Sequence, residues 1–444
     1  MKKRFITAFF IYSLIFAFVS NSFILVKAHL KSLFLILPLF IFSVALAGIL
    51  GLKSRKLRLR ICYHGIVLLS AFCISVYLSI IYHIVLAFIT IPDSYTDFLW
   101  SALCTVILNA VVFWIGIICV YVCSFQLGLK KRVIGIICGL IPVANLIVLF
   151  TLIGTVFEEV KFEYEKEIKN QKRKDMRVCE TRYPILMVHG FFFRDYKYFD
   201  YWGRIPDELR LNGAEIYYGN HQSALKVCES AQELSVRIKE ILEQTGAEKV
   251  NIIAHSKGGL DCRYAVSKLG MAPYVASLTT VNTPHRGCEF ADYLLTKIPQ
   301  GVQDKVASTY NAAMRKLGDE HPDFLAAVDD LTASSCQSFN SEIGLEVPDG
   351  IYCQSVGTIL KKASGGKFPL NFSYHLVKHF DGPNDGLVSS SSFEWGEKFT
   401  LLKPRKNAGI SHGDIIDLNR MNLKDFDVRE FYVQLVNDLK NKGF

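Results

Sequence analysis

A serine between small residues stands in the second half of the chain. Residues 254–259 read Ala-His-Ser-Lys-Gly-Gly, between the apolar run Val250–Ala254 and a helical pattern at Leu260–Leu269. A strand, a sharp turn and a helix in this order form a nucleophile elbow, in which small flanking residues let the serine hydroxyl project above the sheet. Ser256 is therefore predicted to be a nucleophile. The alternative is that Ser256 only caps the following helix.

Attack on a carbonyl group also needs donors for the oxygen that becomes negatively charged. The earlier apolar run Ile185–Val188 is followed by His189, Gly190 and Phe191, and the glycine lets the backbone turn close to the serine. We expect the backbone amides of Phe191 and Lys257 to be these oxyanion donors. We expect the Lys257 ammonium group to be solvated. His189 comes too early in the chain to be the base of this fold and should hydrogen-bond locally.

The order of residues selects the acid and the base. In an α/β-hydrolase the nucleophile is followed by the acid and then by the histidine. Asp385 lies in an Asn-Asp-Gly turn, and His412 is the one histidine that follows it. Asp385 is therefore the predicted acid and His412 the predicted base, with Asp381 as the alternative acid.

The elements that position these residues alternate between strands and helices. Short apolar runs at Ile185–Val188, Val250–Ala254 and Leu278–Val281 are typical of buried parallel strands. Between them, Ala231–Gln244 has apolar residues at helical spacing. This alternation predicts an open, mostly parallel α/β sheet with helices on both faces, which binds ligands at the carboxyl ends of its strands.

The first third of the chain has a different composition. The 444 residues are 51% hydrophobic and carry a net charge of +9, which excludes a disordered chain. Residues 1–157 contain 13 Lys and Arg but only 2 Asp and Glu, so the positive charge comes from this part. A basic excess between apolar stretches is a membrane-topology signal and argues against nucleic-acid binding. The 12 cysteines form no CxxC pair, which argues against a disulfide scaffold or a zinc site.

Five apolar stretches are long enough to cross a membrane, where a helix needs roughly 20 residues. They lie at about 5–26, 33–52, 62–91, 99–125 and 133–157. The first is too long for a signal peptide and lacks a clear cleavage site. Placing the basic clusters at 53–60 and 130–132 in the cytoplasm predicts an extracytoplasmic C-terminal domain, although one miscounted span reverses this result. The apolar cores hold no charged residue, which favours an anchor over a transporter.

Several segments resemble a known enzyme family. Residues 183–190, 201–206 and 249–256 are similar to the secreted bacterial triacylglycerol lipases of the Pseudomonas and Burkholderia type, and so are 283–287, 384–388 and the region of His412. The resemblance implies an α/β-hydrolase fold with Ser256 as nucleophile, Asp385 as acid and His412 as base. It also implies that the amides of Phe191 and Lys257 bind the oxyanion. It extends intermittently from about Tyr183 to Asn419 and does not reach the membrane part.

The sequence departs from this family at two places. The family disulfide pairs a cysteine like Cys353 with one after the Asn-Asp-Gly turn, and here Ser389–Ser392 occupy that position. The family also binds a structural calcium through two Asp side chains. Asp414 matches one of them, and the segment that should supply the other is shortened. The chemistry itself needs no cofactor, and the resemblance leaves a structural calcium open.

These observations predict three parts. They are a transmembrane helical domain at 1–157, a charged linker at 158–180 and a hydrolase domain at 181–444. A helical insert at about 287–344 is similar in position to the lipase lid; its apolar faces either pack on the core or meet a lipid surface.

The expected function is a membrane-anchored serine lipase or carboxylesterase that acts on lipid acyl esters. The alternatives are an acyltransferase or thioesterase with the same triad, and a non-catalytic binding module.

Overall fold

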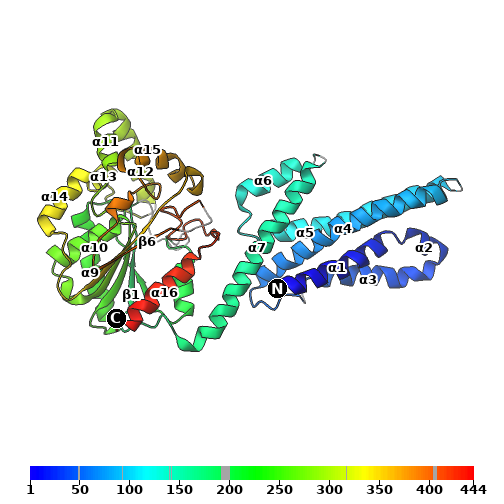
Figure 1. The fold of residues 1–444 in the computed structure, drawn as a ribbon, viewed down its shortest axis with the longest axis horizontal. Coiled ribbons are helices and arrows are strands. Elements are labelled where there is room, and N and C mark those ends of the chain that lie inside the picture. Colours follow the sequence, from blue (N-terminus) through cyan, green and yellow to red (C-terminus); the bar gives the residue numbers. More distant parts are fainter. Residues whose placement is uncertain are drawn as a thin grey trace. The chain divides into compact units, whose positions relative to one another are not determined.

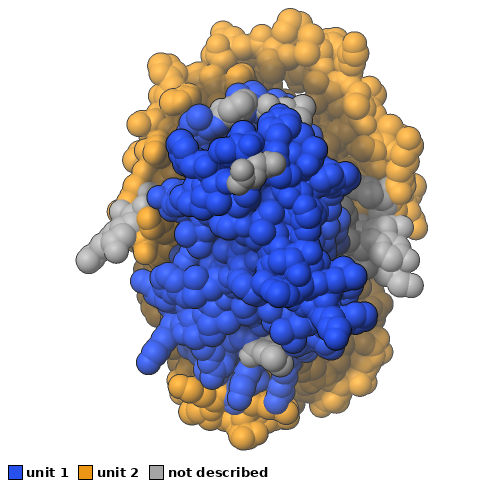
Figure 2. All heavy atoms as spheres, turned by 90° about the vertical axis from the view of Figure 1, so that its right-hand side faces the viewer, with its two compact units in different colours: residues 1–171 blue, residues 172–444 orange. Residues whose placement is uncertain are grey.

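The computed structural model describes residues 1–444 except 49–50, 93, 140, 142, 192–200, 317 and 404–407. The chain forms two compact units (Figures 1 and 2), which we call unit 1 (Met1–Gln171) and unit 2 (Lys172–Phe444). The predicted boundaries at 157/158 and 180/181 both lie near this division and remain predictions of the domain organisation.

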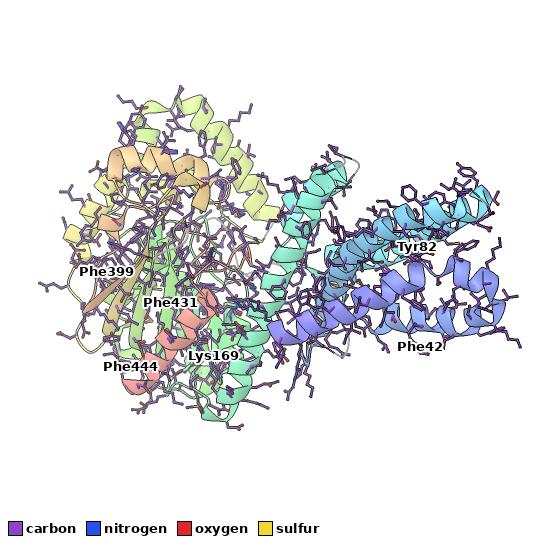
Figure 3. All side chains as sticks on the ribbon, turned by 45° about the vertical axis from the view of Figure 1, so that its right-hand side comes forward. Phe42, Tyr82, Lys169, Phe399, Phe431 and Phe444 are labelled. Atoms are coloured by element: carbon purple, nitrogen blue, oxygen red, sulfur yellow. The ribbon has the colours of Figure 1, made fainter. Side chains whose placement is uncertain are left out.

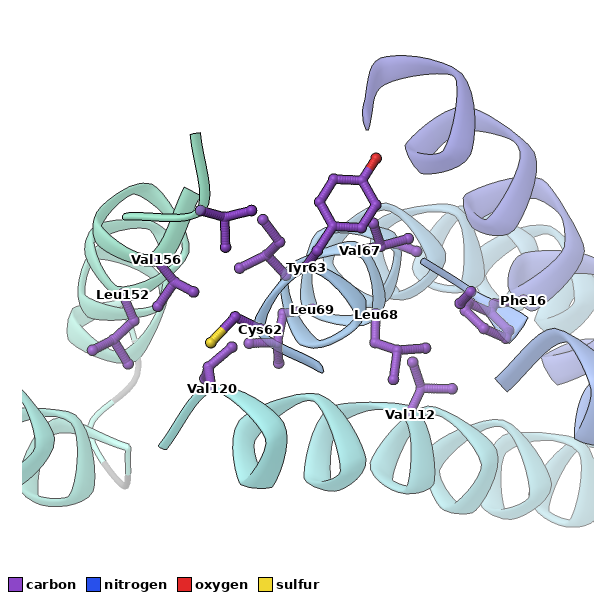
Figure 4. Packing of buried hydrophobic residues seen from close by; sticks show 14 of the residues in the cluster. Phe16, Cys62, Tyr63, Val67, Leu68, Leu69, Val112, Val120, Leu152 and Val156 are labelled. Carbon is purple, nitrogen blue, oxygen red and sulfur yellow. The ribbon is translucent and has the colours of Figure 1, made fainter. Parts of the chain in front are cut away.

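Unit 1 is built from helices. They are α1 (Lys2–Ser20), α2 (Phe23–Ala28), α3 (Leu33–Leu46), α4 (Leu57–Thr90), α5 (Tyr95–Cys123), α6 (Gly128–Cys138) and α7 (Ala144–Arg173), whose end lies in unit 2. Helix α4 is central: its buried residues Tyr63 and Leu68 pack among side chains of α1, α5 and α7 (Figure 4). Large apolar side chains also cover the outside of unit 1, for example Phe42 (Figure 3). Such a surface is typical of a lipid environment.

Three of the described helices, α1, α4 and α5, are long and apolar enough to cross a membrane. The prediction of five spans is therefore wrong. The stretch at 33–52 forms a helix that ends at Leu46, and with the preceding 3₁₀ turn its apolar length is only Leu30–Leu46. The stretch at 133–157 is divided between α6 and α7, and α7 carries charged residues from Glu158 onward. Window hydropathy alone did not reveal where these helices end.

Unit 2 contains a six-stranded parallel sheet in the order β2-β1-β3-β4-β5-β6. The strands are β1 (Ile185–Val188), β2 (Ile216–Tyr218), β3 (Val250–His255), β4 (Val275–Val281), β5 (Tyr352–Thr358) and β6 (Lys398–Leu402). Strands β1, β3 and β4 are buried along their whole length, which explains why apolar residues occur at both alternating positions of each strand. The predicted parallel α/β fold is confirmed.

Helices cover both faces of the sheet (Figure 1). Met187 and Ile253 point to the face covered by α8 (Ile205–Leu211) and α16 (Val428–Asn441). Their neighbours Val188 and Ala254 point to the opposite face, where α9 (Val227–Thr245) and α10 (Lys257–Lys268) pack. This alternation follows from the two-residue period of a strand. Helices thus pack on both faces of the sheet, and the loops that follow the strands lie at its carboxyl edge.

The expected helical insert follows β4. It consists of α11 (Glu289–Lys297), α12 (Gln300–Lys316), α13 (Phe324–Asp329) and α14 (Ala333–Ile343), and α15 (Leu370–Asp381) follows β5. Because these helices enter after the carboxyl ends of β4 and β5, they lie on the edge of the sheet where Ser256 stands.

Candidate active site

Ser256 occupies a strained turn between β3 and α10. Its backbone has φ 55° and ψ −131°, a region that non-glycine residues rarely adopt. The neighbouring backbone is very close: a Cβ at Gly190 would lie 2.7 Å from the Ser256 Cβ, and a Cβ at Gly258 would lie 2.4 Å from the His189 carbonyl oxygen. The small residues that the sequence places around Ser256 are therefore required by space. This geometry is that of a nucleophile elbow and not of an ordinary helix cap.

Asp385 and His412 lie in contact. The His412 Nδ1 is 2.6 Å from the Asp385 Oδ2, and the backbone amide of His412 donates to the Asp385 carbonyl oxygen. The Asp385 carboxylate is fully buried; Oδ2 also accepts from Asn282 Nδ2, and Oδ1 accepts from the amides of Leu387 and Val388. A carboxylate at Nδ1 fixes that proton and leaves Nε2 to accept another.

The alternative acid, Asp381, has a different set of partners. Its carboxylate accepts hydrogen bonds from the backbone amides of Glu289 and Phe290, at the start of α11. Asp381 thus caps a helix of the insert, while Asp385 is the carboxylate that the structure places beside His412.

The residue before the serine connects the elbow to the histidine. The ring of His255 packs against the ring of His412, with 4.5 Å between their centroids. The Gly190 amide donates to the Tyr201 hydroxyl, which is hydrogen-bonded to the His255 Nδ1 at 2.6 Å. Burial and the adjacent His412 hold the pKa of His255 well below its usual value, so His255 stays neutral. Sequence reasoning missed this connection, although Tyr201 lay within a segment that resembles the lipases.

The two expected oxyanion donors lie on either side of the elbow. Lys257 is the first residue of α10, where a backbone amide has no acceptor within the helix. Phe191 follows Gly190 and is buried beneath the insert: its ring packs against Tyr310 of α12 and Phe324 of α13, and its carbonyl oxygen accepts from the Tyr310 hydroxyl at 3.0 Å. The insert therefore packs directly on the residue that precedes the undescribed segment 192–200.

The expectation of a solvated Lys257 ammonium group is wrong. The side chain is buried between α9 and α10, where Nζ donates to Ser230 Oγ at 2.9 Å and to Asp261 Oδ1 at 2.8 Å. His221 lies 3.7 Å from the other Asp261 oxygen and stacks on His189. Burial raises the pKa of Asp261 to about 7. A buried polar network thus lies directly beneath the elbow.

Removing the Lys257 charge should destabilise unit 2. Lys257→Met leaves the Asp261 carboxylate buried without its cation, and we expect the free energy of unfolding to fall by about 3 kcal/mol. Lys257 lowers the pKa of the Asp261 carboxyl, so this pKa should rise above about 7 in the variant, and the loss relative to the unmodified protein should grow as the pH rises above about 7. Thermal unfolding of the full chain in detergent measures both effects.

The matched control for this change is the double variant Lys257→Met/Asp261→Leu, which removes both charges. It should recover most of the loss, because apolar residues of similar volume can replace a buried ion pair at little cost. Equal melting temperatures for the single and double variants would contradict the interpretation of Lys257 and Asp261 as a buried ion pair.

The residues around His412 do not fit a calcium site. The Asp414 carboxylate accepts from the amide and hydroxyl of Ser411, at 3.1 and 2.7 Å. Asp417 is paired with Arg204, whose Nε and Nη2 each lie 2.7 Å from a different carboxylate oxygen. Within the described residues, no group of three or more His, Cys, Asp and Glu side chains could hold a metal ion. Protein cations and hydroxyls thus hold the loop that follows His412.

Calcium removal should therefore leave the protein unchanged. We expect a chelator such as EGTA to alter neither ester hydrolysis nor the melting temperature, because Asp414 and Asp417 already have protein partners. Arg204→Gln should instead lower the melting temperature, since it leaves Asp417 buried without its cation. A loss of ester hydrolysis in EGTA that is reversed only by added Ca²⁺ would contradict this prediction.

The family disulfide is also replaced. All twelve cysteines lie within the described residues and are unpaired, including Cys353. Serines occupy the position of the second cysteine of the family disulfide. Ser389 Oγ donates to the Asp381 carbonyl oxygen, and Ser392 Oγ donates to the Gly287 carbonyl oxygen. Hydrogen bonds therefore hold the loop after Asp385 in place.

A parallel sheet with a strained elbow serine and a buried Asp–His pair at its carboxyl edge defines the class of α/β-hydrolases. The triacylglycerol lipase of Vibrio cholerae is 30% identical to this chain over 290 residues, which cover 60% of the chain and 89% of that relative. Those of Pseudarthrobacter phenanthrenivorans and Burkholderia plantarii are both 37% identical over 218 residues. The chain belongs to the triacylglycerol lipase family.

The extent of these matches is limited. The matched part spans 64% of the Pseudarthrobacter relative and 57% of the Burkholderia relative, and 46% of this chain in both cases. No family model matches the chain. Among solved structures, the mature form of a Bacillus licheniformis lipase has a TM-score of 0.43 at 22% identity, covering 57% of this chain and 91% of that one.

Proposed function

We propose that the protein is a membrane-anchored serine lipase or carboxylesterase that hydrolyses acyl esters of the triacylglycerol type. The observation that carries this proposal is the 2.6 Å contact between His412 and the buried Asp385, at the same sheet edge as the strained Ser256. The family to which the chain belongs supports the same reaction class.

The proposed reaction has two halves. His412 Nε2 takes the proton of the Ser256 hydroxyl as its oxygen attacks the ester carbonyl carbon, and the amides of Phe191 and Lys257 stabilise the resulting oxyanion. His412 then gives the proton to the leaving alcohol, and an acyl-enzyme remains. Water, activated by His412, releases the fatty acid and regenerates Ser256. Asp385 holds the tautomer of His412 and stabilises its charged form in both halves.

Unit 1 is proposed to anchor the enzyme as a multi-pass region. The apolar helices α1, α4 and α5 support association with a membrane. With three crossings, unit 2 lies on the same side as the basic clusters at 53–60 and 130–132, because no crossing separates unit 2 from the second cluster. Placing these clusters in the cytoplasm therefore leads us to propose a cytoplasmic unit 2, where five spans predicted the extracytoplasmic side. Counting the shorter apolar helix Leu30–Leu46 as a fourth crossing changes the side of the N-terminus and leaves unit 2 with the clusters.

A fluorophosphonate probe tests the serine and its sidedness together. Intact cells that express the full chain are treated with a charged, membrane-impermeant fluorophosphonate, and nitrophenyl esters of different chain length compete for labelling. Labelling of Ser256 supports the nucleophile. Labelling only after permeabilisation supports the cytoplasmic side, and labelling of intact cells overturns it. No labelling in either case would refute the nucleophile.

Product analysis with an added alcohol or lysolipid separates hydrolysis from acyl transfer. Free fatty acid as the main product supports the hydrolase, and a new ester as the main product identifies an acyltransferase.

A further inference from the structure

Helix α15 presents an apolar stripe to the outside of unit 2. Phe368, Phe372 and Leu376 are 86%, 72% and 40% exposed and follow one another at intervals of four residues, so they share one side of the helix and its leading turn. Tyr374 and Val377 are buried on the opposite side. Two largely exposed phenylalanines on one stripe are unusual for a surface that meets only water.

The chain segment that carries this stripe is basic. Between Asp349 and Asp381 the sequence contains no acidic residue, and it holds four lysines and two histidines. Asp381 itself is used by the amides that begin α11. We call the exposed residues Lys362, Lys367, Phe368, Phe372 and Leu376 the α15 surface.

The inner side of α15 contacts the loops of the proposed active site. The Ser373 hydroxyl donates to the Gly386 carbonyl oxygen, next to Asp385, and Asn384 Nδ2 donates to the Tyr374 carbonyl oxygen. Leu370 lies against Gly386 and close to Gly413, which follows His412. The helix thus joins the acid turn and the histidine loop on one side to the α15 surface on the other.

We propose that the α15 surface binds the surface of an anionic phospholipid bilayer. Phenylalanine and leucine side chains enter the boundary between head groups and acyl chains, while lysines beside them attract anionic head groups. An acidic protein partner would also attract the lysines. However, two exposed phenylalanines on successive turns favour a lipid phase. This surface lies outside the helical insert at 287–344, and the proposal does not depend on the proposed hydrolysis.

Photo-crosslinking in the full chain tests the proposal. The chain is reconstituted in nanodiscs of phosphatidylcholine alone or with phosphatidylglycerol, with Phe372 replaced by photoreactive p-benzoylphenylalanine. The same replacement at Val236, which is 59% exposed on α9 and has no such surroundings, is the matched control. We expect lipid adducts at position 372 that increase with phosphatidylglycerol, and few at position 236.

Three results would overturn the proposal. They are adducts at 372 with a second protein copy in place of lipid, equal lipid adducts at 372 and 236, and no dependence on phosphatidylglycerol. The variant Lys362→Gln/Lys367→Gln should weaken binding to the anionic surface roughly fivefold for each charge removed. Fluorophosphonate labelling of the same samples reports separately on Ser256, so a failed proposal of hydrolysis is distinguishable from a failed docking surface.

Discussion

Ser256→Ala is expected to lower kcat for ester hydrolysis by roughly a million-fold, which leaves only the reaction assisted by substrate binding and oxyanion donors. The change removes the one oxygen that forms the acyl-enzyme, and alanine fits the turn because it is smaller than serine. The unusual backbone of residue 256 is imposed by the elbow, where Gly190 and Gly258 allow close approach. The measurement is hydrolysis of a nitrophenyl ester by the full chain in detergent.

The control for this change is Ser338→Ala on the exposed side of α14, which should retain full activity. Both variants should melt at the temperature of the unmodified protein, so that lost activity reports on chemistry. Combining Ser256→Ala with His412→Ala should cost little more than either alone, because the residues act as one unit. Appreciable hydrolysis by Ser256→Ala would refute the proposed mechanism.

Asp385→Asn should lower kcat by about ten-thousand-fold, although it preserves the shape of the side chain. The Asp385 Oδ1 accepts two backbone amides, so the asparagine oxygen must occupy that position and its NH₂ group must replace Oδ2. There it would face two donors, the Asn282 NH₂ group and the His412 Nδ1–H. His412 would have to place its proton on Nε2, where it can no longer accept from Ser256.

Asp381→Asn is the matched control for this change. It removes a charge only four residues away and keeps an acceptor for one of the two α11 amides, which bind different Asp381 oxygens. The start of α11 should be less stable, but kcat should change little because Asp381 does not contact His412. Comparing kcat of the two variants at the same pH distinguishes the two candidate acids. If Asp381→Asn proved as damaging as Asp385→Asn, the acid would have to be reassigned.

The sheet and the Asp–His pair could be predicted from sequence because local chemistry determines them. Strands β1 and β3 are buried on both faces, so they are rich in apolar residues on both faces, and this is visible without tertiary information. The elbow requires small residues near Ser256, and the family order of acid and histidine left Asp385 and His412. The strand composition and the elbow can each be recognised from a few adjacent residues, and the acid and the histidine from their order along the chain.

Other features depended on contacts that are distant in sequence. Lys257 is buried because Ser230 and Asp261 line the space between α9 and α10, and no property of the residues around 257 reveals this. The packing of Phe191 beneath Tyr310 and Phe324 joins segments more than 100 residues apart. In unit 1, long apolar stretches concealed where helices end, because hydropathy does not show the helix boundaries between α6 and α7.

The loop after Asp385 owes its position to serine hydroxyls, with Cys353 left as a thiol. Assembly of this part of the enzyme therefore requires no electron acceptor and no thiol-oxidising catalyst. A reductant such as dithiothreitol has no bond to break there, and the same polypeptide can mature in a reducing or an oxidising compartment.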